Sequence, residues 1–383
     1  MNKGAERLKY IEEYYFSKKL REVKDLINNG APIINMGIGS PDLDPPVSVV
    51  NSIKESLKHK NAHQYQSYKG INDLRLEISN FYSRFYNIKL NADKNILPLL
   101  GSKEGIMHIS LAFLNPGDEV LIPDPGYPTY SSVTKIVGAT PRYYNLDSKN
   151  NWYPDIDSLQ SSDISKVKLM WINYPHMPTG TPAEISKLED IVSFTQKNNI
   201  ILVNDNPYSQ ILNDNPVSIL NINNSFKNCL ELNSLSKMFN MAGWRVGMVL
   251  GSKEHIDNIL KIKSNMDSGM FYGVQVGAIN ALKSDKDWFY NLNNIYKKRR
   301  EIIYKICDKL NLEYRNDSVG MFVWAKIKNE SSSEKLSDFL LYKKNIFVAP
   351  GFIFGRNGEG YVRFSLCINE AQIYEALKRL IWR

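Results

Sequence analysis

Short apolar runs alternate with amphipathic stretches between about residues 95 and 250 of this 383-residue chain. The apolar runs are typical of strands buried on both faces, and the stretches between them have helical spacing, most clearly at 183–196. Strands that alternate with helices predict a mostly parallel sheet that is covered on both sides. The predicted strands are 96–100, 119–122, 142–145, 168–173, 200–204, 230–233 and 246–250.

The pattern changes after about residue 283 and predicts a smaller α+β domain there. Its predicted elements are a long helix at 288–310, a strand at 320–327, a helix near 333–342, a strand at 361–366 and a last helix at 370–382. Residues 6–28 have the spacing of one helix, followed by an extended segment, and we expect them to join this domain. The prediction is therefore a large domain, 46–283, and a small domain built from 1–45 and 284–383.

Composition and charge exclude several classes of protein. Apolar residues make up 43% of the chain, so disorder is not indicated. The net charge is +8, but the densest basic cluster, 297–300, falls in a predicted helix and indicates a solvated helix face rather than a nucleic-acid site. Three distant cysteines, and histidines without metal-ligand spacing, indicate a reduced cytoplasmic protein without a metal ion. A charged amino terminus and the lack of long apolar runs predict no signal segment and no membrane partner.

The most informative motif is Ser234-Leu235-Ser236-Lys237, with Arg245 eight positions after the lysine in a glycine-flanked turn. A lysine amine forms Schiff bases with carbonyl cofactors, and an arginine fork matches the oxygens of a phosphate. Pyridoxal 5'-phosphate supplies both an aldehyde and a phosphate. Taken alone, Ser-x-Ser-Lys is a weak signal, because serines and lysines are common in surface loops.

Two other predicted strands end in residues that suit the same cofactor. Gly101-Ser102-Lys103 follows strand 96–100 and opens a helix, so its backbone N–H groups can face an anion, although it also reads as an ordinary turn. Asp205 follows strand 200–204 and can pair with a protonated pyridine nitrogen or cap a helix. Tyr208, three residues later, can donate a hydrogen bond to a ring oxygen.

Two further residues leave alternatives open. Tyr127 lies in a proline-rich loop after strand 119–122, where it either stacks on a flat heterocycle or packs in the core. Arg363 lies in an otherwise apolar strand, and a buried guanidinium needs an anion. That anion is either a substrate carboxylate or an internal acidic residue.

Together these motifs resemble the class I/II aminotransferases of pyridoxal-phosphate fold type I, and the resemblance covers essentially the whole chain. It includes Gly39 in the segment 36–42 and Tyr65 in the segment 65–70. The resemblance implies an α/β fold: a large three-layer domain with a mostly parallel seven-stranded sheet, plus a smaller α+β domain. It also implies a transaminase that moves an amino group between an L-amino acid and a 2-oxo acid such as 2-oxoglutarate.

The resemblance assigns a role to each matched residue. The implied catalytic residues are Lys237, as the Schiff-base lysine, Asp205 and Tyr208. The implied cofactor-binding residues are these three with Ser102, Lys103, Tyr127, Ser234, Ser236, Arg245 and Tyr65. Tyr65 is expected to reach the phosphate of a neighbouring subunit, which implies a homodimer. The implied substrate-binding residues are Gly39, Arg363 and Tyr127.

One position departs from the family's pattern. Met177 stands where the family has an asparagine that donates to the ring oxygen, and a thioether has no N–H to donate. We therefore predict a higher pKa for the imine that Lys237 forms with the cofactor than in a Met177→Asn variant.

Within the family, the segments 13–16, 101–105 and 267–271 look most like the branch of LL-diaminopimelate aminotransferases and related alanine or aspartate enzymes. Lys103 and the partner subunit's Tyr14 are the candidate contacts for the distal end of such a substrate.

Three other functions share some of these sequence features. A carbon–sulfur β-lyase of the same fold would share every cofactor residue and is the alternative to transamination. A cofactor-sensing transcription regulator would need a DNA-binding module, and only about 30 residues precede the first glycine motif. A nicotinamide dehydrogenase would need G-x-G-x-x-G, but Gly37-x-Gly39 lacks the third glycine and is followed by Pro41.

Overall fold

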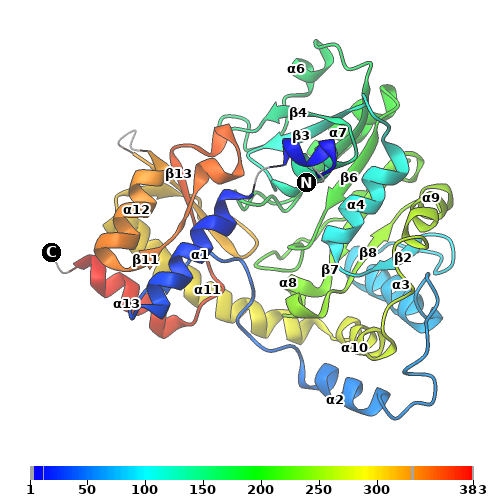
Figure 1. Cartoon of the computed structure of the whole chain (residues 1–383), viewed down its shortest axis with the longest axis horizontal. Helices are drawn as coiled ribbons and strands as arrows, with labels where there is room; N and C mark the ends of the chain where they lie inside the picture. Colours follow the sequence, from blue (N-terminus) through cyan, green and yellow to red (C-terminus); the bar gives the residue numbers. More distant parts are fainter. Residues whose placement is uncertain (1–3, 12, 329–331, 382–383) are drawn as a thin grey trace.

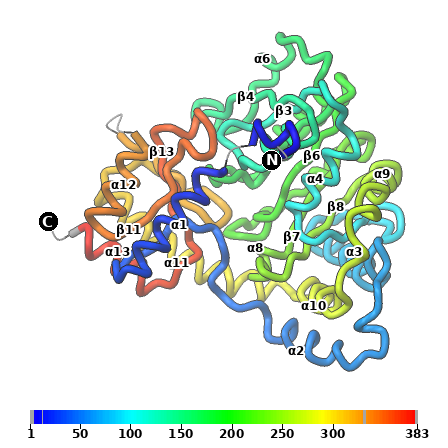
Figure 2. The backbone as a smooth tube through the Cα atoms, in the orientation of Figure 1, coloured from blue at the N-terminus to red at the C-terminus, as the bar shows by residue number. Residues whose placement is uncertain are grey.

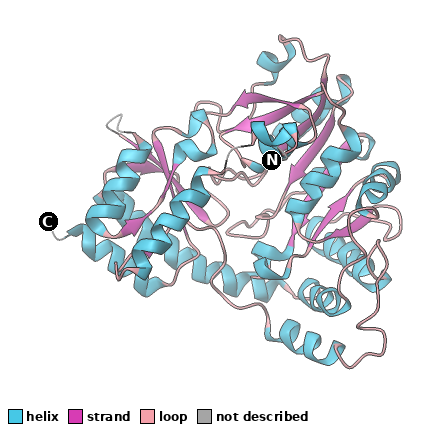
Figure 3. Cartoon of the chain, in the orientation of Figure 1, coloured by secondary structure: helices cyan, strands magenta, loops and turns pink. Residues whose placement is uncertain are grey.

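The computed structural model describes residues 4–11, 13–328 and 332–381. Its largest sheet has seven strands in the order β2-β8-β7-β6-β5-β3-β4 (Figure 3). Every predicted strand of this region is confirmed. The strands are β2 (Ile96–Leu99), β3 (Glu119–Asp124), β4 (Thr140–Asn145), β5 (Val167–Ile172), β6 (Ile201–Asp205), β7 (Cys229–Ser234) and β8 (Gly247–Leu250).

The sheet is mostly parallel, as predicted, with one exception. Strand β8 runs antiparallel to both of its neighbours, β7 and β2. The segment between β7 and β8 holds only a short helix, α8 (Leu235–Met238), and a 3-10 turn, η4 (Ala242–Trp244). A short connection of this kind joins antiparallel strands, whereas a parallel pair needs a longer crossover.

Side chains of the strands alternate between two apolar clusters, one on each face of the sheet. On β5, Leu169 and Trp171 belong to one cluster, and Met170 and Ile172 belong to the other. The first face is covered by α4 (Ser102–Phe113), α5 (Thr129–Ile136) and α9 (Lys253–Lys263), and the second by α3 (Asn72–Tyr86), α7 (Ile185–Lys197) and α10 (Tyr272–Leu282). The predicted three-layer arrangement is therefore confirmed.

A second, four-stranded antiparallel sheet lies in the carboxyl-terminal part, coloured yellow to red in Figure 1. Its predicted strands and helices are confirmed within a few residues, and Trp382, the predicted end of the last helix, lies outside the described residues. The elements are β9 (Leu312–Tyr314), β10 (Phe322–Ile327), β12 (Ala349–Pro350), β13 (Tyr361–Ser365), α11 (Lys286–Lys309), α12 (Ser333–Lys344) and α13 (Glu370–Ile381).

The amino-terminal segment packs against this carboxyl-terminal part. Strand β1 (Ile34–Asn35) pairs in parallel with β11 (Ile346–Phe347), and α1 (Tyr15–Asn28) lies beside α12 and α13 in Figures 1 and 2. The remaining elements are α2 (Val47–Ser56), α6 (Ile156–Gln160), η2 (Ile219–Asn221), η3 (Ser225–Lys227), η5 (Gly351–Phe354) and η6 (Arg356–Gly358). The domain boundaries at residues 46 and 283 stay a prediction.

The prediction of a single helix over 6–28 was wrong. A short 3-10 helix, η1 (Glu6–Tyr10), is separate from α1, because Ile11 (φ −115°, ψ 107°) and Tyr14 (φ −56°, ψ 123°) have non-helical backbone angles. Helix η1 contacts α5, beside the seven-stranded sheet, and buries none of its residues. Sequence spacing could not reveal this break. It arises because η1 packs beside the seven-stranded sheet, whereas the segment that follows α1 pairs with the carboxyl-terminal part.

The prediction of a solvated face for the basic cluster 297–300 was wrong for Arg299, which is 1% exposed. Its guanidinium forms two hydrogen bonds with Asp42, at 2.7 and 3.0 Å, and an ion pair with Glu370 at 3.4 Å. Lys297 and Lys298 are exposed, as expected. Arg299 therefore ties α11 to α13 and to the segment that contains Asp42. Among the described residues, no helix is both long enough and apolar enough to span a membrane.

Candidate active site

A cavity of about 520 Å³ is lined by residues from the seven-stranded and the four-stranded sheets. Asp205 and Ser234 lie at the carboxyl ends of β6 and β7, where parallel sheets bind ligands. From the other side, Phe322 of β10 and Arg363 of β13 enter the same cavity. The sequence-predicted residues that line it are Gly39, Ser102, Lys103, Tyr127, Asp205, Tyr208, Ser234, Ser236, Lys237, Arg245 and Arg363. Tyr65 does not line it; its side chain is 90% exposed.

Lys237 lies in α8, which starts directly after β7. The Oγ atom of Ser234 accepts a hydrogen bond from the backbone N of Ser236 at 3.1 Å and so caps this short helix. The Nζ atom of Lys237 donates to the carbonyl oxygen of Gly39. Burial lowers the pKa of the Lys237 amine, and the charges of Arg363 and Arg245 act in the same direction. A larger uncharged fraction makes this amine a better nucleophile.

An anion cradle lies beside Lys237, where two loops meet. Helix α4 begins at Ser102 without a side-chain cap, so the N–H groups of its first turn are free to bind an anion. Gly101 has a φ of +90°, and a Cβ atom there would collide with the guanidinium of Arg245. The hydroxyl oxygens of Ser234, at the end of β7, and Ser236, in α8, lie 2.9 Å apart. Hydroxyls, backbone donors and an arginine together fit a phosphate group.

Asp205 is 5% exposed, and only one of its two carboxylate oxygens has a hydrogen-bond partner among the described residues. Its Oδ2 accepts a hydrogen bond from Tyr130 at 2.8 Å, and its Oδ1 has no partner in the described part of the chain. Burial raises the pKa of this carboxyl to about 7. An unpaired buried acceptor that lines a cavity calls for a donor, and a protonated ring nitrogen fits it.

Three residues around Asp205 orient the site, and two of them were missed by sequence reasoning. Tyr130, which holds Asp205, also stacks on Trp171 with ring centroids 4.9 Å apart. Asn173 donates to the backbone oxygen of Asp205. Burial raises the pKa of the Tyr208 hydroxyl, so it stays protonated and able to donate. The position of Tyr130 at the start of α5, three residues after Tyr127, is the signal that could have found it.

Arg363 is 6% exposed and has no acidic partner in the described part of the chain. Its Nη2 donates to the oxygen of Gly37 at 2.8 Å, its Nη1 lies 3.5 Å from the Met177 sulfur, and its Nε is unpaired. The rings of Phe322 and Phe354 lie 4.0 and 4.6 Å from the guanidinium carbon. Burial lowers the pKa of Arg363 to about 10, so it remains a cation at neutral pH. Of the two alternatives, an external carboxylate therefore fits better than an internal one.

A further group of residues, from the amino-terminal segment, β10 and η5, lines the cavity, and of this group the sequence had suggested only Tyr14, as a contact from a partner subunit. Tyr14 belongs to the same chain as the cavity, so the expectation that a partner subunit supplies it was wrong for this contact. Burial raises the pKa of the Tyr14 hydroxyl to about 12, against the opposing charge of Arg363. No local motif marks these residues, because only the packing of the amino-terminal segment, β10 and η5 brings them to the site. They are Tyr14, Phe16, Phe322, Ile353 and Phe354.

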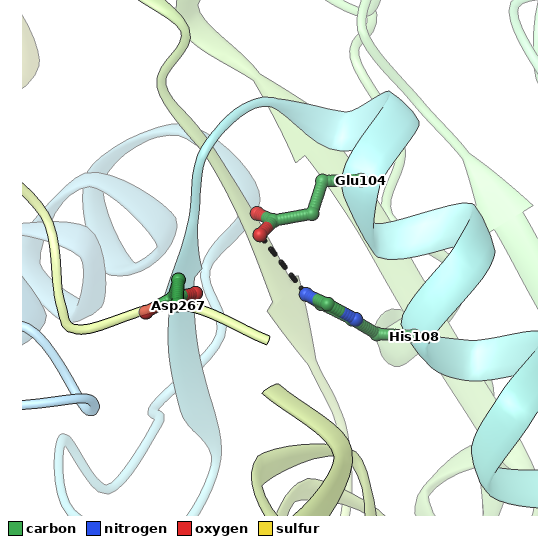
Figure 4. Close-up of side chains that lie close together, drawn as sticks. All are labelled: Glu104, His108 and Asp267. Atoms are coloured by element: carbon green, nitrogen blue, oxygen red, sulfur yellow. Dashed lines mark ion pairs between the residues drawn. The ribbon is translucent and has the colours of Figure 1, made fainter. Parts of the chain in front are cut away.

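A polar cluster braces the loop that precedes Gly101 (Figure 4). Glu104 accepts a hydrogen bond from the backbone N of Leu100, and its other oxygen lies 3.0 Å from Nε2 of His108. Asp267 completes a group of three possible metal ligands within 4.8 Å of one another. Its carboxylate is already paired with Lys263 at 2.6 Å. The expectation that the protein holds no metal ion stays a prediction.

Comparison of the sequence with known proteins gives a consistent result. Residues 31–380 match the model of the family described as aminotransferase class I and II. An LL-diaminopimelate aminotransferase of Halothermothrix orenii is 36% identical, with 98% of this chain and 97% of the relative covered. An LL-diaminopimelate aminotransferase of Aquifex aeolicus is 35% identical, with 98% of each chain covered.

Solved structures agree with the sequence matches. The apo form of BacF from Bacillus subtilis superposes with a TM-score of 0.95 at 32% identity, covering 99% of this chain and 98% of that one. An aminotransferase from Staphylococcus aureus gives a TM-score of 0.90 at 31% identity, with 98% of each chain covered. This chain therefore belongs to the aminotransferase class I and II family and is an enzyme of the transaminase type.

Proposed function

We propose that this protein transfers an amino group between an L-amino acid and a 2-oxo acid such as 2-oxoglutarate, with pyridoxal 5'-phosphate as cofactor. The observation that carries the proposal is the meeting of three incompletely paired groups in one cavity. These are the Lys237 amine with its lowered pKa, the unpaired Oδ1 of Asp205 and the guanidinium of Arg363. Together they fit an aldehyde, a ring nitrogen and a carboxylate.

The residues of the cavity fit the cofactor part by part. Lys237 would hold its aldehyde carbon, Asp205 its ring nitrogen and Tyr208 its ring oxygen, while Tyr127 would lie against the ring. The phosphate would bind in the cradle formed by Ser102, the backbone at Lys103, Ser234, Ser236 and Arg245. When bound, the cofactor supplies an electron sink for the negative charge that develops at the substrate Cα atom.

The protein's own residues would position the substrate and move its proton. Arg363 would bind the α-carboxylate with its two-pronged guanidinium and so orient the Cα–H bond. The Lys237 amine would take the Cα proton and return it to the cofactor side, acting as base and then as acid. Gly39 would let the backbone lie close to the substrate. A Cβ atom at this position would collide with the ring of Phe322.

We also propose a homodimer in which Tyr65 reaches the phosphate site of the neighbouring subunit. The support is its position: Tyr65 is 90% exposed and lies outside the cavity of its own chain. A light-scattering mass twice that of the chain, and a weaker affinity for pyridoxal 5'-phosphate in Tyr65→Phe, would be the expected results. A cytoplasmic location fits the three free cysteines.

The relatives named above support a role in amino-acid biosynthesis, and their names place LL-diaminopimelate, with aspartate- and alanine-type donors, among the donors to be compared. The test is a screen of amino donors with 2-oxoglutarate, in which glutamate formation is measured on protein loaded with pyridoxal 5'-phosphate. We expect turnover of at least one donor, yellow absorbance of the loaded protein, and borohydride fixation of the cofactor on Lys237. In Lys237→Ala, both fixation and turnover should be lost.

The same preparation separates transamination from the β-lyase alternative. Cystathionine is supplied without any 2-oxo acid, and pyruvate is measured. Sustained pyruvate release, together with no glutamate formation from any donor, would refute the transaminase proposal. Fixation of the cofactor on another lysine would refute the assignment of Lys237.

A further inference from the structure

The cavity has two walls of different chemistry. The wall built from the ends of the seven-stranded sheet carries the groups that fit the cofactor. The opposite wall, here called the substrate wall, comes from the amino-terminal segment, β10, η5 and β13. It consists of Tyr14, Phe16, Phe322, Ile353, Phe354 and Arg363. Apart from the Arg363 guanidinium and the Tyr14 hydroxyl, its side chains are wholly apolar.

Apolar surface begins directly at the carboxylate site. The rings of Phe322 and Phe354 lie against the guanidinium of Arg363, at 4.0 and 4.6 Å. These rings are 5% and 6% exposed, and Ile353 is 8% exposed, so they are packed in place. The Met177 sulfur also lies near the guanidinium, 3.5 Å from Nη1. A substrate whose carboxylate binds Arg363 must therefore place its own side chain among apolar groups.

Charged partners for a substrate side chain are scarce. Among the described residues that line the cavity, the only carboxylate is that of Asp205, which Tyr130 already holds at the position that fits the ring nitrogen. Apart from Lys237, Arg245 and Arg363, the only cation among these described lining residues is Lys103, which is exposed and lies on the first turn of α4. Within the described residues of one chain, a second ammonium group on a substrate would thus lose water without gaining a carboxylate.

From this wall we infer that the enzyme prefers α-amino acids with an uncharged aromatic or large aliphatic side chain over LL-diaminopimelate, lysine or aspartate. The inference rests on the proposed function and names the substrate class for it. Burying a phenyl or isobutyl group against such a wall gains affinity, whereas burying an unpaired charge loses it.

The first experiment measures kcat/KM with 2-oxoglutarate on protein loaded with pyridoxal 5'-phosphate. The uncharged donors are phenylalanine, tyrosine, leucine and methionine, and the charged donors are LL-diaminopimelate, lysine and aspartate. We expect the best uncharged donor to exceed every charged one by at least about tenfold.

The second experiment measures binding of unreactive carboxylates by calorimetry on the same loaded protein. 3-Phenylpropanoate has a carboxylate and a ring but no amine, and pimelate has the carbon chain and both carboxylates of diaminopimelate. We expect 3-phenylpropanoate to bind about tenfold more tightly. Ile353→Glu places a carboxylate in the substrate wall, and its matched control is Ile353→Leu. The glutamate variant should weaken 3-phenylpropanoate binding by about tenfold or more, and the leucine variant by less than about threefold.

Each outcome has a defined meaning. Higher kcat/KM for LL-diaminopimelate or aspartate, or tighter binding of pimelate, overturns the inference and leaves the transaminase proposal standing. Equal loss of 3-phenylpropanoate binding in Ile353→Glu and Ile353→Leu also overturns the inference. Lack of turnover with every donor overturns the proposed function and the inference with it.

Discussion

Two buried arginines of the carboxyl-terminal part have opposite surroundings. Arg299 and Arg363 are 1% and 6% exposed, and each lies over an aromatic ring, that of Tyr296 at 5.8 Å and that of Phe322 at 4.0 Å. Arg299 is paired with the carboxylates of Asp42 and Glu370. Within the described ranges, Arg363 has only a backbone oxygen and a thioether near its donors, and one of its nitrogens is unpaired.

The difference separates a structural arginine from a binding one. Although burial opposes it, the hydrogen bond to Asp42 raises the pKa of Arg299. Burial without such a partner lowers the pKa of Arg363 to about 10. A charge held without a partner costs stability, and the fold retains it where a ligand can complete it. Burial of an arginine is therefore not a sign of a site, whereas burial without a partner, beside a cavity, is.

Replacing Arg363 by leucine should have the largest effect. Because a charged pair with the substrate carboxylate is lost, kcat/KM of the loaded enzyme should fall by about 100- to 1000-fold. Thermal stability of the cofactor-free protein should stay within a few degrees of the original, because an unpaired buried charge is removed. Arg363→Lys, which keeps the charge but loses the fork, is the control and should recover only part of the activity. A large loss of stability in Arg363→Leu would contradict the comparison.

Replacing Arg299 by leucine should give the opposite profile. The change leaves Asp42 without its main partner, so the free energy of unfolding should fall by about 3 kcal/mol. Denaturant unfolding measures this loss, and kcat/KM of the folded fraction should change by less than about threefold. Asp42→Asn combined with Arg299→Leu should cost less than the sum of the two single changes.

Asp205 extends the comparison to a buried carboxyl group, whose contribution to the stability of the fold depends on pH. Its native pKa of about 7 lies above the ordinary value of 3.8, so the native protein holds a proton that the unfolded chain releases. The stability from this group is complete below about pH 4 and is lost as the pH rises through about 7. In cofactor-free Asp205→Asn, which cannot ionise, the gain in the free energy of unfolding over the original protein should therefore grow by roughly 3 kcal/mol from pH 4.5 to pH 8, as measured by denaturant unfolding. An equal difference at both pH values would contradict the raised pKa.

Met177→Asn should change the properties of the enzyme least of the four replacements. It would also give the Arg363 guanidinium a hydrogen-bond acceptor. The amide oxygen can accept from the guanidinium, and the amide N–H can donate to the ring oxygen of the cofactor. The imine that Lys237 forms with the cofactor should then have a pKa lower by about one unit, the equivalent of one hydrogen bond. A spectroscopic pH titration measures this pKa. Met177→Leu, which lacks the donor, should leave this pKa unchanged. Equal pKa values for all three proteins would refute the predicted effect of the asparagine donor.

The sequence by itself determined the elements and the residues that suit a cofactor. The alternating pattern predicted all seven strands of the large sheet. Six of them are mainly apolar because they are buried on both faces, whereas the edge strand β4 is half exposed and polar. Lys237, Asp205 and Ser102 were found because parallel strands end at one edge, so residues that follow separate strands meet there.

Only the tertiary structure decided which side chains surround those residues. The break before α1 carries Tyr14 into the cavity, and the packing of β10 and η5 brings Phe322 and Phe354 against Arg363. It also decided that Arg299 is paired and Arg363 is not. The pairing of Arg299 with Asp42 joins positions 257 apart, and even the nearer contacts of Arg363 depend on how separate elements pack together, so no local spacing encodes them.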